Sequence, residues 1–66
     1  MVWIFEREGH RLRCEVTRND ANGTYRIVMA QAGGATTVED IEQPQALIER
    51  TATVMRNLHE HGWRLA

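Results

Sequence analysis

The chain has 66 residues, with no lysine, one cysteine, one proline and no long apolar run. The single cysteine, Cys14, excludes an internal disulfide, so the fold has no covalent crosslink. The apolar stretch near the N-terminus is too short for a signal peptide, and no stretch approaches the length of a membrane span. We therefore expect a single small, soluble, cytoplasmic domain over residues 1–66, without a tail, linker or repeat.

The charges nearly balance. The sequence has eight arginines and nine aspartates and glutamates, which gives a formal net charge of −1 at pH 7. A near-neutral chain has no long-range field that would draw it to nucleic acid or to an anionic membrane. We expect no membrane partner.

Two strands are predicted at residues 3–7 and 11–18, and the second alternates strictly between apolar and polar residues. Glu8-Gly9 suits a two-residue hairpin turn. A turn there places Glu6 opposite Arg11 on one face. On the other face it makes three apolar pairs: Phe5 with Leu12, Trp3 with Cys14, and Met1 with Val16.

Two further turns are predicted from runs of turn-forming residues. A third strand is predicted at residues 25–31, and a four-residue loop at residues 20–23 pairs Val16 with Ile27 and Cys14 with Met29. If Gly33-Gly34 forms the tip of the third turn, Met29 pairs with Val38 and residues 36–41 form a fourth strand. In that register Asp40 lies on the core side of the sheet.

A helix is predicted from Pro44 to about His61, because proline suits the first helical position. An alternative start has Asp40 as N-cap and Gln43 completing a capping box. Gly62 is the expected residue after the helix, in a Schellman motif that packs Trp63 against the helix. At 100° per residue one apolar arc comprises Leu47, Ile48, Thr51, Val54, Met55 and Leu58.

These elements predict an α+β fold, a four-stranded antiparallel β-meander followed by one C-terminal helix packed on one sheet face (ββββα). The expected core is small. It comprises Trp3, Phe5, Leu12, Cys14, Val16, Ile27, Met29, Val38, Leu47, Ile48, Val54, Met55, Leu58 and Trp63.

The strand and helix order resembles the fold of the single-stranded-DNA-binding transcriptional coactivators. The resemblance covers topology over almost the whole chain and no family motif. It implies four-stranded sheets, each followed by a helix, that pair into dimers. Because no motif is shared, it assigns no binding residue to this chain.

Few residues have the spacing of a catalytic or metal site. His59 and His61 point to different sides of a helix and cannot chelate one metal. Cys14 and His10 lie about 13 Å apart along one strand, too far for a catalytic dyad. Gly33-Gly34 lacks the lysine of a phosphate-binding loop. We expect no enzyme activity, no cofactor and no metal site.

Thr51 is the one polar residue inside the apolar arc of the helix. The simpler interpretation is a hydroxyl bonded to the Leu47 carbonyl. The alternative is that Thr51 lines a pocket between helix and sheet, which would make the protein a small-molecule carrier.

The outer face of the sheet, away from the helix, offers two functional readings. Its apolar residues favour a homodimer, because a fully solvated sheet face is usually more polar. The small core favours it too, since a domain of this size has a net stability near zero before any partner is counted. We therefore predict an interaction or regulatory module, with an interface at Val2, Ile4, Val28 and Ala30. Ile41 is a further candidate.

The alternative hypothesis is single-stranded nucleic-acid binding through Arg11, Arg13 and Arg26 on the same face. Two features of the sequence argue against it. Three glutamates are expected to neutralise the arginines: Glu6, Glu15 and Glu39. The aromatic side chains that could stack on bases are expected to point to the core: Trp3, Phe5 and Tyr25.

Overall fold

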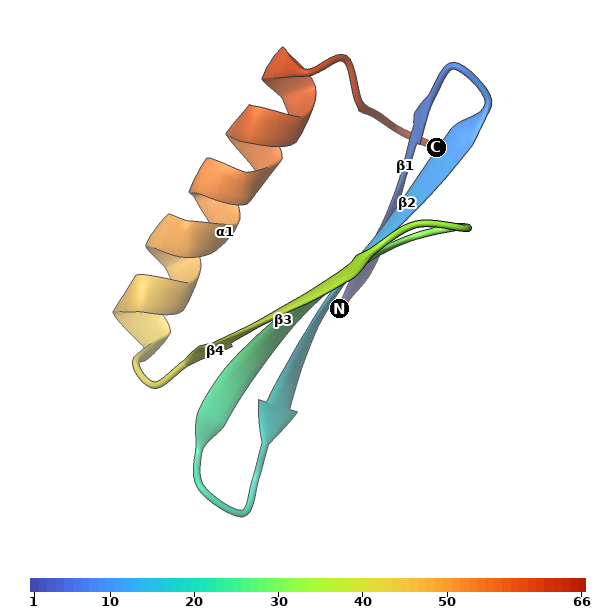
Figure 1. Cartoon of the computed structure of the whole chain (residues 1–66). Helices are drawn as coiled ribbons and strands as arrows, with labels where there is room; N and C mark the ends of the chain where they lie inside the picture. The colour runs from blue at the N-terminus through green and yellow to red at the C-terminus, as the bar shows by residue number, and fades with distance from the viewer.

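The computed structural model describes all 66 residues and shows an α+β fold, one antiparallel sheet with one helix across it (Figure 1). The strands lie side by side in the order β4-β3-β2-β1-β5. The elements are β1 (Val2–Arg7), β2 (His10–Asn19), β3 (Thr24–Gln31), β4 (Thr36–Ile41), α1 (Pro44–Glu60) and β5 (Arg64–Leu65).

The first two hairpins have the predicted registers. Phe5 pairs with Leu12 and Trp3 with Cys14 across β1 and β2. At the turn, Glu8 and Gly9 have φ angles of 50° and 79°, the left-handed conformations that a two-residue type I′ turn requires at both positions. The pairing continues to the first residue, because the Val16 N–H donates to the Met1 carbonyl at 2.8 Å.

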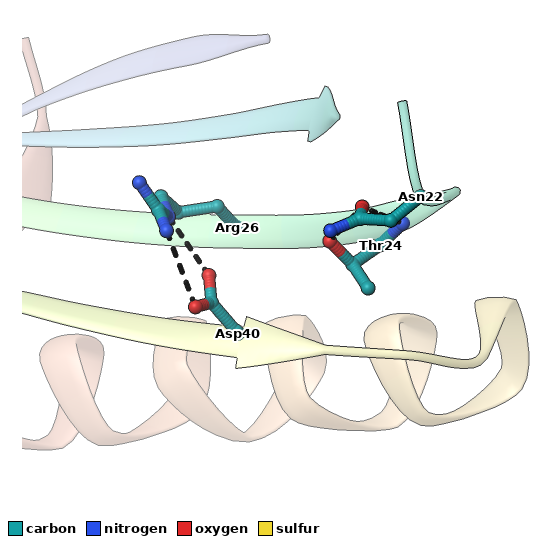
Figure 2. Close-up of polar contacts among 4 residues, drawn as sticks. All are labelled: Asn22, Thr24, Arg26 and Asp40. Atoms are coloured by element: carbon teal, nitrogen blue, oxygen red, sulfur yellow. Dashed lines mark hydrogen bonds and ion pairs between the residues drawn. The ribbon is translucent and has the colours of Figure 1, made fainter. Parts of the chain in front are cut away.

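The second hairpin closes through the predicted four-residue loop, with Asn19 opposite Thr24. The side chain of Asn22 organises the end of this loop. Its Oδ1 accepts the Thr24 N–H at 3.0 Å and the Thr24 hydroxyl at 2.7 Å (Figure 2). An Asn side chain that accepts from the backbone two residues on is the Asx-turn arrangement.

The predicted register between β3 and β4 is wrong by one residue. Met29 pairs with Thr37, and Val38 pairs with Val28 on the outer face. The turn centres on Gln31–Gly34, where the Gly34 N–H donates to the Gln31 carbonyl at 2.9 Å. The pair next to the turn is Ala30 with Thr36, so the connection between the paired strands has five residues. A hairpin with Gly33-Gly34 at its tip would have a connection of two residues.

A shift of one residue turns every side chain of β4 to the other face. Ile41, a candidate for the outer face, is buried in the core at 8% exposure, and Val38, predicted to be in the core, is 56% exposed. Asp40, expected on the core side, lies on the outer face opposite Arg26, and Glu39 lies on the core side opposite Ile27. The reason is the longer turn, which lets Ile41 be buried.

Helix α1 begins at Pro44, as predicted, with Gln43 as an N-cap that makes no side-chain capping bond. Its C-terminus is the predicted Schellman motif. The Trp63 N–H donates to the Leu58 carbonyl at 2.9 Å, and the Gly62 N–H donates to the His59 carbonyl at 3.1 Å. Gly62 has φ +89°, a conformation that glycine adopts without steric cost.

The face of α1 that meets the sheet is rotated from the predicted arc. Val54 is its one buried residue, whereas Ile48, predicted to be in the core, is 65% exposed. Arg50, one turn before Val54, is partly buried and forms an ion pair with Glu39 of β4 at 2.8 Å. The rotation brings Arg50 towards β4 and turns Ile48 towards solvent.

A short fifth strand was not predicted. Beyond Trp63 the chain returns to the sheet, and β5 pairs antiparallel with β1, Leu65 opposite Phe5. Figure 1 shows this return from the end of the helix to the edge of β1. The return places Trp63, 6% exposed, in the core between helix and sheet.

The core is thin. Seven of 66 residues are buried, and they are Phe5, Leu12, Cys14, Ile27, Ile41, Val54 and Trp63. The partly buried residues packed against them are Trp3, Val16, Tyr25, Met29, Leu47, Met55 and Leu58. One helix therefore covers only part of the face on which it lies.

Candidate functional site

The outer face of the sheet carries a band of apolar side chains that no element of the chain covers. The register places Val2, Val28 and Val38 in one row across the strands, and Ile4 and Ala30 in the next. Val2 is 50% exposed and Val38 is 56% exposed. The four predicted interface residues thus share one face, and we call them, together with Val38, the outer apolar band.

Val38 is the member that the sequence prediction missed. In the register with a two-residue turn it belongs to the core, so its contribution to the outer face could not be seen. The signal was present in Ile41, since a register that buries Ile41 necessarily turns Val38 outward.

The three arginines predicted on the outer face are each paired with a carboxylate of the same face. Arg11 bonds Glu6 across β1 and β2 at 3.0 Å, and Arg13 pairs with Glu15 two residues along β2. The third pair joins β3 to β4 (Figure 2): Arg26 Nε donates to Asp40 Oδ1 at 2.8 Å, and Nη2 to Oδ2 at 3.2 Å. This two-point contact is the geometry in which arginine binds carboxylates best.

The pairing has an electrostatic consequence. The hydrogen bond from Arg26 lowers the pKa of the Asp40 carboxyl below 3.8 and raises that of the arginine. These three arginines meet three carboxylates, so the outer face over β1 to β4 has no excess positive charge to offer a phosphate backbone.

The aromatic side chains lie on the other face. Trp3, Phe5 and Tyr25 share the core side of the sheet with Cys14 and Met29, as predicted. The Arg18 guanidinium lies 6.0 Å from the Tyr25 ring centroid, also on that side. The outer face therefore has arginines without an aromatic surface on which bases could stack.

Cys14 packs in the core, and the His61 ring contacts the end of the helix. Cys14 is 1% exposed, and burial raises the pKa of its thiol, which keeps it in the unreactive form. The His61 ring contacts the Asn57 carbonyl through Nδ1 at 2.7 Å. No three His, Cys, Asp or Glu side chains come together as a metal site.

Thr51 is partly buried, and the predicted bond from its hydroxyl to the Leu47 carbonyl is not formed. The helix has a bond of this kind at Thr53, whose Oγ1 donates to the Glu49 carbonyl at 3.0 Å. A cavity of about 240 Å³ does lie beside the helix, but its helical lining is Arg50, Val54, Asn57, Leu58 and His61. The pocket near Thr51 that the carrier hypothesis requires is thus displaced towards Arg50.

The chain is extended for its size. It exposes 4733 Å², whereas a monomeric protein of 7.6 kDa typically exposes about 4,300 Å². Its radius of gyration is 12.3 Å, against about 11 Å for a compact domain of this length. Both values reflect the half-covered sheet. The helix is not long and apolar enough to cross a membrane.

Comparison with protein-family models, curated protein sequences and solved structures yields no match for this chain. The topological resemblance to the single-stranded-DNA-binding coactivators gains no support from these comparisons. The function must therefore be argued from the surfaces themselves.

Proposed function

We propose that this protein is a small non-enzymatic interaction module that works as a homodimer, with the outer apolar band at its interface. The observation that carries the proposal is the placement of five aliphatic residues on the one sheet face that the helix leaves bare. An antiparallel sheet with a solvated face usually alternates cleanly between apolar and polar residues, and this face does not.

The charges around the band suit a second copy of the same face. In a two-fold dimer the same patch meets itself, so a patch with excess charge of one sign would repel its copy. Here Arg11, Arg13 and Arg26 are each neutralised within the chain. Arg13 and Glu15 lie on β2, between the band residues of β1 and those of β3. They pair with each other, so a second copy that buries them leaves neither charge without a partner.

The dimensions are adequate for such an interface. The molecule measures 38 × 22 × 17 Å, so its largest projection is on the order of the 800 Å² that each partner buries in a standard interface. Burial of the band would also supplement a core of only seven buried residues.

Sedimentation equilibrium over a range of micromolar concentrations tests the proposal. We expect a monomer–dimer equilibrium, shifted strongly to monomer by Val38→Glu. This change places a charge in the band at a position that is 56% exposed in the isolated chain, so the fold itself should tolerate it.

Ile48→Glu is the matched control, because Ile48 is 65% exposed and lies on the helix, away from the outer face. It should leave the dimer intact. A chain that stays monomeric throughout the micromolar range would refute the homodimer. A dimer lost with Ile48→Glu and kept with Val38→Glu would move the interface to the helix side.

A further inference from the structure

A second surface lies between α1 and the sheet, on the edge of the helix that faces β4. Its cavity of about 240 Å³ has an apolar floor formed by Met29, Val54, Leu58 and Trp63. A neighbouring cavity of about 310 Å³ shares Arg7, Met29, Leu58 and Trp63 and extends to Leu12 and Ala35. Together they form one groove, which we call the Arg7–Arg50 groove after the two charged residues at its rim.

The rim of the groove carries a net positive charge from Arg7, since the charge of Arg50 is paired with Glu39. Its polar residues are Arg7, Arg50, Asn57 and His61 around the first cavity, with no aspartate or glutamate among the lining residues. The carboxylate of Glu39 contacts the rim, and its two oxygens accept from Arg50 Nε at 2.8 and 3.1 Å. Both contacts use Nε, and the terminal Nη1 and Nη2 of Arg50 make no hydrogen bond within the chain.

Arg7 is held in place with donors to spare. Its guanidinium lies 4.4 Å from the Trp63 ring centroid, and Nη1 donates to the His61 carbonyl at 3.0 Å. Nε and Nη2 have no hydrogen-bond partner in the chain. Stacking on an aromatic ring restricts the side chain, so less conformational entropy is lost when these donors bind an anion.

We propose that the Arg7–Arg50 groove binds a small monocarboxylate with an apolar body. The carboxylate would accept from the free guanidinium donors, and the body would lie on Met29, Leu58 and Trp63. The first cavity equals the volume of about eight water molecules, which suits a ligand of about ten non-hydrogen atoms. Such a ligand binds with a Kd on the order of 1 mM.

Octanoate is the probe, with octan-1-ol and butyrate as matched compounds that lack the charge or most of the body. Proton–nitrogen NMR spectra of the labelled protein report the binding site. We expect saturable shifts at the Trp63 indole, the Asn57 side-chain amide and the Leu58 backbone amide. Octanoate should bind more tightly than either matched compound. The Trp3 indole lines neither cavity of the groove but shares a third cavity with Trp63, so it reports binding at that competing site.

Three variants test the chemistry. Arg50→Gln should weaken octanoate binding about fivefold, the upper range for a partly exposed ion pair. Glu39→Gln should strengthen it, because it removes the carboxylate that competes for Arg50. Arg56→Gln is the control, since Arg56 is exposed, lines neither cavity and forms none of the ion pairs.

Several results would overturn the proposal: shifts that do not saturate, equal affinity for octanoate and octan-1-ol, shifts as large at Trp3 as at Trp63, or equal weakening by Arg50→Gln and Arg56→Gln. The groove lies on the opposite face of the sheet from the outer apolar band. Val38→Glu should therefore leave octanoate binding unchanged, so the groove and the homodimer succeed or fail independently.

Discussion

The guanidinium of Arg7 lies 4.4 Å from the ring centroid of Trp63, and its Nη1 donates to the His61 carbonyl at 3.0 Å. One side chain of β1 thus contacts both the C-terminal carbonyl end of α1 and the aromatic residue that follows it. The last carbonyls of a helix carry partial negative charge, so a cation there is favourable. This contact joins the first strand to the last elements of the chain and is one of the contacts between the end of the helix and the sheet.

Trp63→Ala should lower the free energy of unfolding by about 3–5 kcal/mol, because Trp63 is 6% exposed and is one of only seven buried residues. A domain of this size has a total stability of about 3–10 kcal/mol, so the variant should be largely unfolded or close to it. Urea unfolding followed by circular dichroism measures the change. Thermal stability near that of the unmodified protein would show that Trp63 does not hold the helix in place.

Arg7→Met should cost about 1 kcal/mol, since it keeps an apolar side chain over Trp63 and removes the cation–π contact and the bond to His61. The same urea experiment reports this smaller loss. Arg11→Met, at an exposed arginine of the outer face, is the control and should cost less. Equal losses in the two variants would mean that the contact with Trp63 is energetically unimportant.

The hairpins could be predicted from the sequence because local patterns agree there. Glu8-Gly9 indicates one turn, and a one-residue slip from the resulting register would put Phe5 and Leu12 on opposite faces. The β3–β4 turn has no such redundancy. Gly33-Gly34 permits both a two-residue tip and the longer turn, and with apolar residues at 38 and 41 on opposite faces, either register buries one of them.

The residues of the Arg7–Arg50 groove could not be predicted from the hydrophobic periodicity of the sequence. A helical repeat of 100° per residue defines an apolar arc, but not which edge of it meets the sheet. That edge is decided in three dimensions by contacts such as Arg50 with Glu39. Likewise, the role of Arg7 required the position of the helix end, and β5 is a two-residue strand formed after that end is in place.

The register of β4 makes a sharp prediction about two residues of similar size. Ile41→Ala should destabilise the fold by about 2–4 kcal/mol, because Ile41 is 8% exposed, whereas Val38→Ala should change stability by less than about 0.5 kcal/mol in the monomer. Both variants are compared by urea unfolding at a concentration where the monomer dominates. The register with a two-residue turn at Gly33-Gly34 requires the reverse order of losses.

Arg26 and Asp40 predict a pH dependence. The hydrogen bond from Arg26 holds the pKa of the Asp40 carboxyl below its ordinary 3.8 in the folded chain. A group with a depressed folded pKa stabilises the fold above its unfolded pKa, and this contribution is lost as the pH falls through the folded value. The contribution should therefore be complete at neutral pH and disappear only below about pH 3.8.

Carbon-13 NMR of the Asp40 carboxyl, titrated from pH 6 downward, measures this pKa directly. In Arg26→Gln the midpoint should return towards 3.8, and added salt should raise it slightly because both side chains are more than half exposed. A midpoint that is unchanged in Arg26→Gln would show that the ion pair does not persist in solution.

The paired arginines also decide what to expect with nucleic acid. A labelled single-stranded oligonucleotide at low salt should show no binding that weakens with rising salt, because Arg11, Arg13 and Arg26 each hold a carboxylate and the aromatic residues face the core. Fluorescence anisotropy at about 50 mM salt is the measurement.

Glu15→Gln is the informative variant, since it frees Arg13. Weak, salt-dependent binding that appears only in this variant would show that pairing suppresses the interaction. If the unmodified protein binds the oligonucleotide and Arg13→Glu abolishes that binding, the outer face is a nucleic-acid surface. The outer apolar band would then not be available as the interface with a second copy of the chain.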